Sequence, residues 1–243
     1  NATDAIVRSA VLYALRLLVC EPLPLNEGLM EAVDIVLDHG MLNPRFESDP
    51  AACPAIVGGN VETSQRIVDA LLAAFGLVAA SQGTMNNVTF GNERFGYYET
   101  IGGGTGAGDG FDGASGVHSH MTNTRLTDAE VLEHRYPVRV CRLQLRTGSG
   151  GAGRWRGGDG IVRELEFLEP VTLSVMTQRR AMGPPGMSGG KPGSPGIQRV
   201  LRRKGTIEDL SALDRAELDA GDHFVIETPG GGGFGTPEKD RAE

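Results

Sequence analysis

The sequence has few cysteines, and they form no pattern. Cys20, Cys53 and Cys141 lie far apart and none belongs to a CxxC pair. Neither a disulfide framework nor a thiolate zinc site of that spacing is therefore indicated. This usage is typical of a reducing compartment, so we expect a cytoplasmic protein.

Long hydrophobic runs are absent as well. The most apolar stretch, residues 5–19, is interrupted by Arg8 and Arg16 and is too short to span a bilayer. It also lacks the cleavage pattern of a signal peptide. We expect no membrane role.

Basic charge is scarce and dispersed. Lysine and arginine number 23 against 31 acidic residues, which gives a net charge of −8 and a pI near 5.2. This balance argues against a nucleic-acid surface. At 243 residues and 40% hydrophobic content, the chain can bury a proper core. It begins at Asn1 without a methionine and enters a helical pattern at once, so we expect a piece of a longer protein.

Glycine is abundant and clustered. Most of the 36 glycines fall in four blocks, residues 102–116, 148–160, 183–196 and 230–235. Glycine weakens helix and strand interiors, and clusters of it mark backbone that adopts positive φ or approaches another group closely. The blocks therefore predict tight, closely packed connections between β-strands.

Three of these blocks contain GxGxxG, at residues 108–113, 148–153 and 230–235. A dinucleotide fingerprint must follow a strand and open a helix, and the residues after these motifs predict no helix. No GxxxxGK[ST] occurs either. The sequence thus predicts that any nucleotide is bound by another domain or subunit.

Helical patterns dominate the first third. Residues 4–19 repeat apolar side chains at helical spacing, with Asn1, Thr3 and Asp4 as caps. Residues 31–37 fit a strand or a short helix, and we favour the strand. A second helix follows Asn60 or Thr63 as its cap and ends at Gly76.

Short β-patterns follow from residue 88 onward. We predict strands over residues 138–146, 161–168, 171–176, 199–202 and 223–227. The fold class is therefore α+β, with helices mainly in the first third and an antiparallel, glycine-looped β-rich remainder. Residues 1–87 and 88–243 are the two expected parts, packed together as one fragment.

Two histidines form the best metal-like cluster in the chain. His118 and His120 flank one residue, and Asp109 and Asp112 lie close upstream as oxygen ligands. A histidine pair without a third ligand at a defined spacing also occurs in ordinary hydrogen-bonded turns. Substrate contact or a structural role is favoured over metal binding.

Other polar motifs have a structural explanation beside a functional one. Thr127 and Glu130 fit a capping box, and we favour structural roles for Glu133 and His134 over acid–base chemistry. The Arg154-Trp-Arg trio and the Arg179-Arg pair suit either anion binding or loop anchoring.

Several ordered motifs together resemble the C-terminal part of the hydantoinase B family, and within it the ATP-dependent oxoprolinases. The resemblance covers essentially the whole chain. It rests on Gly58-Gly-Asn-Val-Glu-Thr-Ser-Gln-Arg, Ser81-Gln-Gly-Thr-Met-Asn-Asn, Tyr98-Glu-Thr-Ile-Gly-Gly-Gly-Thr-Gly-Ala, Asp112-Gly, His118-Ser-His-Met-Thr-Asn-Thr, Glu130-Val-Leu-Glu-His-Arg-Tyr-Pro, Gly148-Ser-Gly-Gly-Ala-Gly-Arg-Trp-Arg-Gly-Gly and Gln178-Arg-Arg.

The resemblance implies one part of a cyclic amide hydrolase. A hydantoinase A-like domain or subunit would bind ATP and Mg and phosphorylate the amide oxygen, and the B-type part would complete ring opening with water; for oxoprolinases the product is L-glutamate. It further implies a small-molecule cyclic amide as substrate, a homo-oligomer, and no nucleic-acid or membrane partner.

The chain departs from the complete family pattern in one respect. Metal-binding His and Asp residues of such proteins belong to a preceding segment, so a divalent metal would be held mainly upstream and the fragment alone would be inactive. We assign no catalytic residue. The expected substrate-binding wall consists of Asn60, Asn86, Asn87, Asp112, His118, His120 and Asn123.

The same scaffold leaves two alternatives open. One is the B-type part of an N-methylhydantoinase or of a carboxylase-like enzyme. The other is a non-catalytic scaffold or interaction domain that docks the ATP-binding part.

Overall fold

The computed structural model describes residues 1–19, 21, 22, 24 and 26–237. Helices come mainly before the strands, as the α+β prediction requires. The helical elements are α1 (Asp4–Leu18), the short turns η1 (Glu27–Met30) and η2 (Pro50–Ala52), the π-helical turn η3 (Gly59–Thr63), α2 (Ser64–Ala74) and α3 (Ala129–Arg135). The strands are β1 (Asn87–Gly91), β2 (Gly96–Glu99), β3 (Val138–Arg146), β4 (Gly160–Phe167), β5 (Val171–Met176), β6 (Ile197–Leu201), β7 (Ile207–Asp209), β8 (Leu213–Leu218) and β9 (His223–Glu227).

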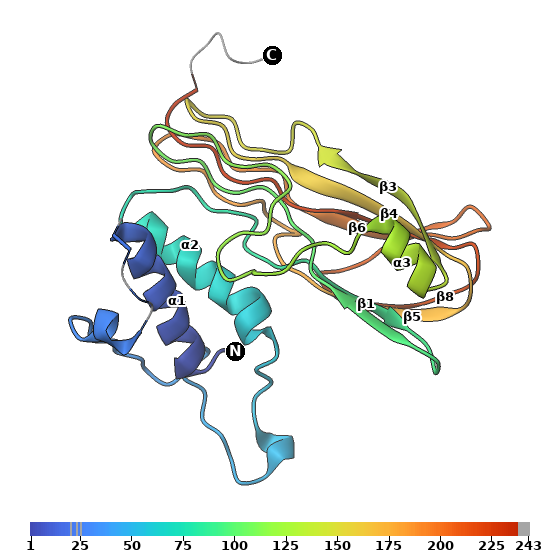
Figure 1. Cartoon of the computed structure of the whole chain (residues 1–243), viewed down its shortest axis with the longest axis horizontal. Helices are drawn as coiled ribbons and strands as arrows, with labels where there is room; N and C mark the ends of the chain where they lie inside the picture. The colour runs from blue at the N-terminus through green and yellow to red at the C-terminus, as the bar shows by residue number, and fades with distance from the viewer. Residues whose placement is uncertain (20, 23, 25, 238–243) are drawn as a thin grey trace.

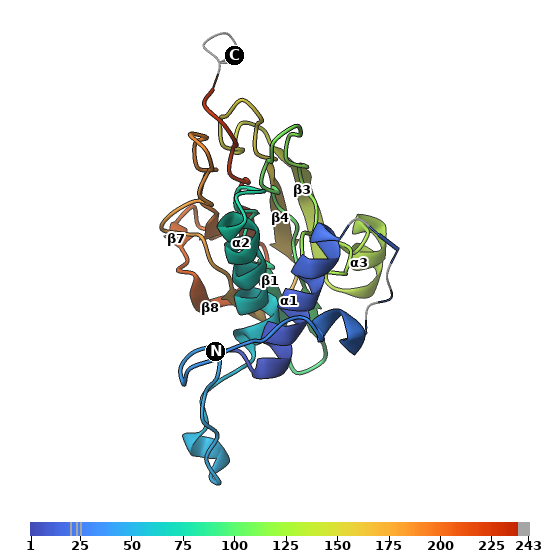
Figure 2. The same ribbon diagram turned by 90° about the vertical axis from the view of Figure 1, so that its left-hand side faces the viewer.

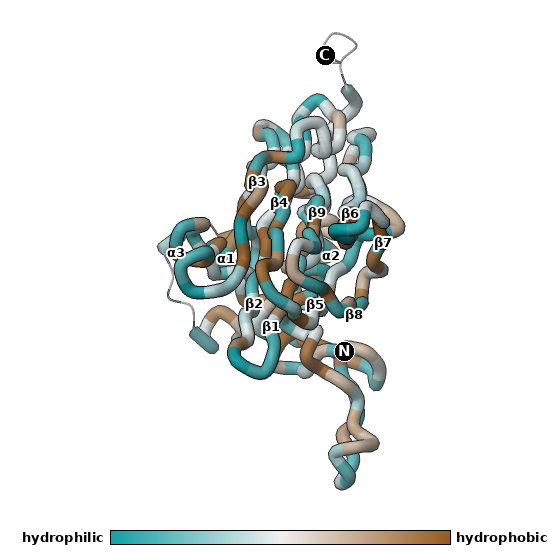
Figure 3. Tube along the Cα trace, turned by 90° about the vertical axis from the view of Figure 1, so that its right-hand side faces the viewer, coloured by the Kyte–Doolittle hydropathy of each residue, from teal (hydrophilic) through white to brown (hydrophobic). Residues whose placement is uncertain are grey.

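The strands form two antiparallel sheets. One has the order β2-β1-β5-β8, and the other has the order β3-β4-β9-β6-β7, which Figure 3 shows from its open side. Their inner faces share one core, in which the rings of Phe90 and Phe167 meet edge to face with centroids 5.2 Å apart. Leu132 of α3 is fully buried against this core. Burial of these apolar side chains is the main stabilising contribution.

Helices α1 and α2 pack on each other beside the sheets (Figures 1 and 2). Ala10 of α1 and Val68 and Leu72 of α2 form a second, small core, with Tyr13 and Met121 at its edge. The two cores are separate because the side of α2 that faces the sheets is polar. Among the described helices, none combines the length and the apolar character needed to cross a bilayer.

The helix predictions are largely confirmed. Helix α1 matches the expected range, and Gly76 ends α2 with a φ of 69°. Thr3 and Thr63 occupy the N-cap positions of α1 and α2 as predicted, although neither makes a side-chain cap bond, and the alternative cap Asn60 lies inside the π-helical turn. Helix α3 is capped by Asp128, which accepts from Glu130 N and Val131 N, so the predicted capping box is wrong.

The strand predicted over residues 31–37 does not form. This stretch is a turn followed by irregular backbone, and Val36 is 88% exposed. No described strand pairs with it, so it gains neither ladder hydrogen bonds nor apolar burial. Cys20 lies outside the described residues.

All five strands predicted in the β-rich part are present within a few residues of their expected ends. The prediction missed the β1–β2 hairpin and the strands β7 and β8. Four strands of the larger sheet and one of the smaller were therefore found, and their antiparallel pairing is confirmed.

The four glycine blocks run side by side beyond the strand ends, at the upper left of Figure 1. A Cβ on Gly104 would lie 1.9 Å from the Gly158 oxygen, and one on Gly231 would lie 1.8 Å from the Thr105 oxygen. Backbone hydrogen bonds such as Gly231 N to Gly158 O (2.8 Å) join the blocks. Only glycine fits such close backbone packing, as at the axis of a collagen triple helix. We call this assembly the glycine bundle.

Candidate functional site

One face of α2 and its π-helical turn carries buried polar side chains. Glu62, Gln65 and Asp69 recur at helical spacing and are 5%, 0% and 6% exposed. π-helical turns of this kind occur frequently at functional sites. The face contacts residues 81–87, residues 117–122 and the Arg179–Arg180 pair. We call this contact the polar seam.

At one end of the seam, Asp69 holds a histidine. His120 Nε2 lies 3.0 Å from Asp69 Oδ1, which also accepts from Ser81 N at 2.9 Å. The His120 and Asp69 side chains are only 9% and 6% exposed. His120 adopts a φ of 51°, an uncommon conformation for a residue with a side chain, and such strain is typical of functional sites. A buried His–Asp pair is an arrangement that can accept a proton.

Two arginines approach the same carboxylate. A Cβ on Gly83 would lie 3.0 Å from Arg66 Cδ, 3.2 Å from Arg179 Nε and 3.2 Å from Asp69 Oδ2. Arg179 also has a positive φ, of 59°. Burial, together with the like charge of Arg66, lowers the pKa of Arg179 to about 10, and Asp69 partly offsets this. Two cations against one carboxylate leave this end of the seam attractive to an anion.

At the other end, Glu62 is protonated at neutral pH. Burial raises the pKa of its carboxyl to about 8, against the lowering effects of its hydrogen bonds and of Arg180. Its Oε1 accepts from Thr84 Oγ1 and Asn87 Nδ2, both at 2.8 Å. A buried acid in this state can donate a proton.

Arg180 and the two asparagines tie the seam to both sheets. Arg180 donates to Asn86 Oδ1 and to Gln198 Oε1, both at 3.0 Å. Asn86 in turn donates to Gln82 Oε1 at 2.8 Å. Asn87 donates to Met176 O at 2.7 Å. These amides therefore orient charged groups from within the protein.

The seam also contains buried polar atoms without a hydrogen-bond partner among the described residues. Such atoms are rare in folded proteins and indicate bound water, an ion or a ligand. His118 is one example, because both of its ring nitrogens are unpaired and burial lowers its pKa, so the ring is neutral at neutral pH. The others are Glu62 Oε2, Gln65 Oε1, Asp69 Oδ2, Gln82 Nε2, Ser119 Oγ and Arg179 Nε.

A cavity of about 350 Å³ adjoins the Glu62 end, on the outer face of the smaller sheet. Asn87 and Tyr98 line it, and the Tyr98 hydroxyl donates to Asn87 Oδ1 at 2.7 Å. Burial and the nearby Glu62 carboxyl raise the pKa of Tyr98, so it remains a phenol. Mainly apolar side chains, among them Val57 and Met176, complete the wall.

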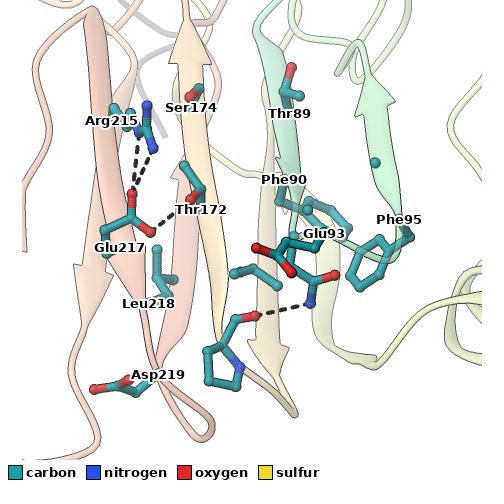
Figure 4. A pocket seen from close by; sticks show the side chains of 15 residues that line it. Thr89, Phe90, Glu93, Phe95, Thr172, Ser174, Arg215, Glu217, Leu218 and Asp219 are labelled. Atoms are coloured by element: carbon teal, nitrogen blue, oxygen red, sulfur yellow. Dashed lines mark hydrogen bonds and ion pairs between the residues drawn. The ribbon is translucent and has the colours of Figure 1, made fainter.

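A second hollow, of about 810 Å³, continues along the same sheet face (Figure 4). It shares Thr89 and Ser174 with the first. Its one arginine is paired, since Arg215 Nη2 lies 3.0 Å from Glu217 Oε1, and Glu217 also accepts from Thr172 at 2.7 Å; the other charged side chains in its lining, Glu93 and Asp219, are acidic. The larger hollow is therefore less suited to hold a charged ligand than the seam.

The structure brings some of the predicted site residues together and leaves others apart. His120, Asn86 and Asn87 belong to the seam, and His118 is next to it. Asn60, Asp112 and Asn123 are exposed at the surface. Asp112 accepts from Arg156 N at 2.6 Å, a contact within the glycine bundle. Their role in substrate binding remains a prediction.

The prediction did not include the charged residues of the seam. Glu62 and Asp69 lie seven positions apart on one helix face, and this spacing was the signal that could have found them. The Arg179–Arg180 pair was noticed, although its two possible roles, anion binding and loop anchoring, were not separated.

Glu133 and His134, for which structural roles were favoured, lie on the short helix α3. Glu133 accepts from Val140 N at 2.7 Å.

A metal does not fit the seam residues by themselves. His120 and Asp69 supply two ligand atoms, whereas zinc sites use three or four protein ligands. In the described part of the chain, the group of three ligating side chains that converge is Cys141, Glu164 and His223, on the other sheet. We therefore assign no catalytic role to a metal ion bound by the seam residues.

None of the three GxGxxG motifs opens a helix, because irregular backbone follows each of them within the described residues. Their backbone groups bond to other blocks of the glycine bundle, as Gly151 N does to Gly231 O at 2.8 Å. The expectation that these motifs are not dinucleotide fingerprints is consistent with this packing.

The fold combines two antiparallel sheets, the glycine bundle and a helix pair whose polar face lies against the sheets. Solved structures share this α+β fold. The crystal structure of an ATP-dependent caprolactamase from Pseudomonas jessenii has this fold, with a TM-score of 0.77 and 27% identity over 94% of this chain and 42% of that one. An acetone carboxylase shares the fold alone, with a TM-score of 0.74 at 18% identity.

The chain belongs to the hydantoinase B/oxoprolinase family, whose model matches residues 1–237. It is 48% identical over 97% of its length to proteins named 5-oxoprolinase in Dictyostelium discoideum and 5-oxoprolinase 1 in Arabidopsis thaliana. It is 31% identical over 88% of its length to the B-type component of a putative D-/L-hydantoinase from a Pseudomonas strain. The chain spans only 18% of each of the two 5-oxoprolinases and 37% of the hydantoinase component.

Proposed function

We propose that the chain is the C-terminal part of the B-type region of an ATP-dependent 5-oxoprolinase, which couples ATP hydrolysis to the opening of 5-oxo-L-proline to L-glutamate. The observation that carries this proposal is the 48% identity to proteins named 5-oxoprolinase across nearly the whole chain. Identity to the putative hydantoinase component is lower, at 31%. The structural similarity to an enzyme named for an ATP-dependent reaction of a cyclic amide supports the same class of substrate.

The chemistry requires activation of a stable amide. Transfer of a phosphoryl group to the lactam oxygen would make the ring carbon electrophilic, and water would then attack it. Attack by this first water breaks the carbon–nitrogen bond and leaves an acyl phosphate, which a second water hydrolyses, so that two waters are consumed and ADP, phosphate and glutamate are formed. Such a reaction needs a proton acceptor for water, contacts to anionic oxygens and shielding from bulk solvent.

The polar seam offers groups of these kinds. The buried pair of His120 and Asp69 would take the proton from water. Arg66 and Arg179 crowd against Gly83, where a Cβ would lie 3.0 Å from Arg66 Cδ and 3.2 Å from Arg179 Nε, and their positive charges would hold anionic oxygens. Glu62, protonated at neutral pH, would supply a proton on the side of Asn87 and Tyr98.

The other components of the enzyme are proposed to lie outside this chain. A hydantoinase A-like domain or subunit would bind ATP and Mg, which is supported by the absence of a helix after any GxGxxG motif in the described residues. A divalent metal would be held mainly by residues upstream. We further propose a homo-oligomer in the cytoplasm that serves glutathione metabolism.

The test is the reaction of the full-length protein with 5-oxo-L-proline and ATP. We expect L-glutamate and ADP to form in equal amounts and neither to form when one substrate is omitted. N-methylhydantoin and a ketone with bicarbonate serve as competing substrates. Faster turnover of either would overturn the oxoprolinase assignment in favour of a hydantoinase or a carboxylase.

A further test separates an enzymatic region from a scaffold. The full-length variants Asp69→Asn and His120→Gln are compared with Asp38→Asn, an exposed carboxylate outside the predicted substrate-binding wall that is changed in the same way. A scaffold that only docks the ATP-binding part would keep the rate of glutamate formation in all three. We expect the first two alone to lose it.

A further inference from the structure

An irregularity in the larger sheet places a cysteine beside a histidine and a glutamate. The pairing of β3 with β4 shifts between Val140 and Arg142, so Cys141 is the extra residue of a β-bulge. Bulges re-aim side chains and are common near functional sites. Glu164 and His223 come from the next two strands, β4 and β9, which pair with each other. Three neighbouring strands thus bring three side chains to one outer face.

The ligand atoms of these side chains already converge. One atom from each of Cys141, Glu164 and His223 lies within 4.8 Å of the other two. His223 Nδ1 is 2.9 Å from Glu164 Oε1. The second oxygen of Glu164 accepts from Arg142 Nη2 at 2.9 Å, so that Oε1 is left to face the cysteine and the histidine. An outer partner of this kind fixes the orientation of a ligating carboxylate.

We propose that Cys141, Glu164 and His223 form a binding site for a single zinc ion, with water as the fourth ligand. Thiolate, imidazole and carboxylate are the three ligand types that zinc takes from proteins, and a tetrahedral site needs few adjustments of side chains that lie this close. The cation would replace the hydrogen bond between His223 and Glu164. The site is independent of the polar seam and of the proposed function.

The surrounding charges favour a cation over a reactive cysteine. Arg139 and Arg142 are occupied by Glu166 and Glu164, at 2.7 and 2.9 Å. With both guanidinium groups paired, neither is placed to stabilise the Cys141 thiolate, which is the reactive form of a nucleophilic cysteine. A metal ion forms the thiolate as it binds and releases the proton.

The surroundings also leave the site accessible. Cys141 is exposed, and the side chain of His223 is 31% exposed. An ion can therefore enter from solvent without unfolding the sheet. For the same reason, conservative substitutions of Cys141 should leave the fold intact.

Cobalt titration of the full-length protein tests the site, because a cobalt–thiolate bond gives a charge-transfer absorption that oxygen and nitrogen ligands do not give. We expect one equivalent of this band, displaced by zinc. The Cys141→Ser variant should lack the band, and His223→Gln should weaken cobalt binding at least about tenfold. A Cys20→Ser/Cys53→Ser variant, which keeps Cys141, is the matched control and should keep the band.

Thermal unfolding provides a second measurement that does not depend on absorption or on activity. Zinc should raise the unfolding temperature of the wild type and of the control variant, because it binds the folded state. It should raise that of Cys141→Ser less, because any metal held by upstream residues does not depend on Cys141. An absent band, a band that survives in Cys141→Ser, or equal zinc stabilisation of both variants would overturn the proposal.

Discussion

The core between the two sheets and the polar seam are both buried, but they consist of opposite kinds of side chain. Between the sheets, apolar and aromatic side chains such as Phe90 and Phe167 fill the space. In the polar seam, Glu62, Gln65 and Asp69 are buried with partners that satisfy only some of their atoms. The first arrangement yields stability because most of its buried side chains are apolar, although it also holds Arg163, which is paired with Glu99 at 3.1 Å. The second lowers the stability of the fold, because charged groups are held away from water without all of their hydrogen bonds, as a reactive site requires.

The largest expected effect comes from a substitution in the apolar core between the sheets. Phe167→Ala removes a fully buried ring from the shared core and should lower the free energy of unfolding by about 3–5 kcal/mol. Denaturant unfolding measures this loss. Ile207→Ala, at a side chain that is 64% exposed, is the control and should change stability little. Equal losses in the two variants would contradict the placement of the core.

The next largest effect comes from a substitution in the polar seam. Asp69→Asn keeps the shape of the side chain that holds His120 but removes its charge. We expect the full-length enzyme to lose about 100-fold in kcat, the contribution of an acid–base group, while the free energy of unfolding falls by no more than about 2 kcal/mol. Steady-state kinetics and denaturant unfolding are measured on the same preparation. A loss of stability as large as that of Phe167→Ala, with kcat retained, would place Asp69 with the structural residues.

A smaller effect, the pH dependence of stability, tests whether the buried Glu62 of the polar seam is protonated. The folded-state pKa of Glu62, about 8, lies above its unfolded value, so the folded state binds more protons between these values. The stability that this proton contributes is fully present below the unfolded pKa and is lost as pH rises through 8. Between pH 6 and 8 the wild type should lose about 2 kcal/mol more than Glu62→Gln, in which the amide replaces the protonated acid.

The control for this dependence is Glu217→Gln, at an exposed carboxylate paired with Arg215. That variant should follow the wild type across the same pH range. Parallel curves for Glu62→Gln and the wild type would show that Glu62 is ionised in the folded protein.

The smallest effect concerns the surface. Asn123 is exposed, and Asn123→Ala should change stability by less than about 0.5 kcal/mol and turnover less than twofold. Asn87→Ala, which removes a donor to Glu62, should reduce both much more. A strong loss of turnover in Asn123→Ala would restore this residue to the substrate-binding wall that its motif predicted.

The difference between the two regions also explains what the sequence could reveal. Strand β5 was predicted with its observed bounds because alternating apolar residues record the burial of one face. The β1–β2 hairpin escaped because Asn87, Gly91 and Gly96 interrupt the pattern. Its formation depends on pairing with β5, which comes about eighty residues later in the chain.

The seam was harder to predict for a similar reason. Asn86, Asn87 and His120 were selected from motifs, whereas Glu62 and Asp69 look like ordinary polar positions of an amphipathic helix. They are buried only because residues 81–87 fold back along α2, and no local pattern encodes that contact. Residues 31–37 show the converse, since an apolar pattern without a partner strand forms no strand.

The glycine bundle has a consequence for the order of folding. Its last block, residues 230–235, bonds to each of the others: Ala107 N donates to Gly232 O, Gly151 N to Gly231 O, and Gly233 N to Lys191 O. The bundle therefore cannot close until this last block has left the ribosome. Contacts between such distant segments form slowly, and until they form the unpaired backbone is open to wrong partners. A truncation that removes the last block should release the other three from one another.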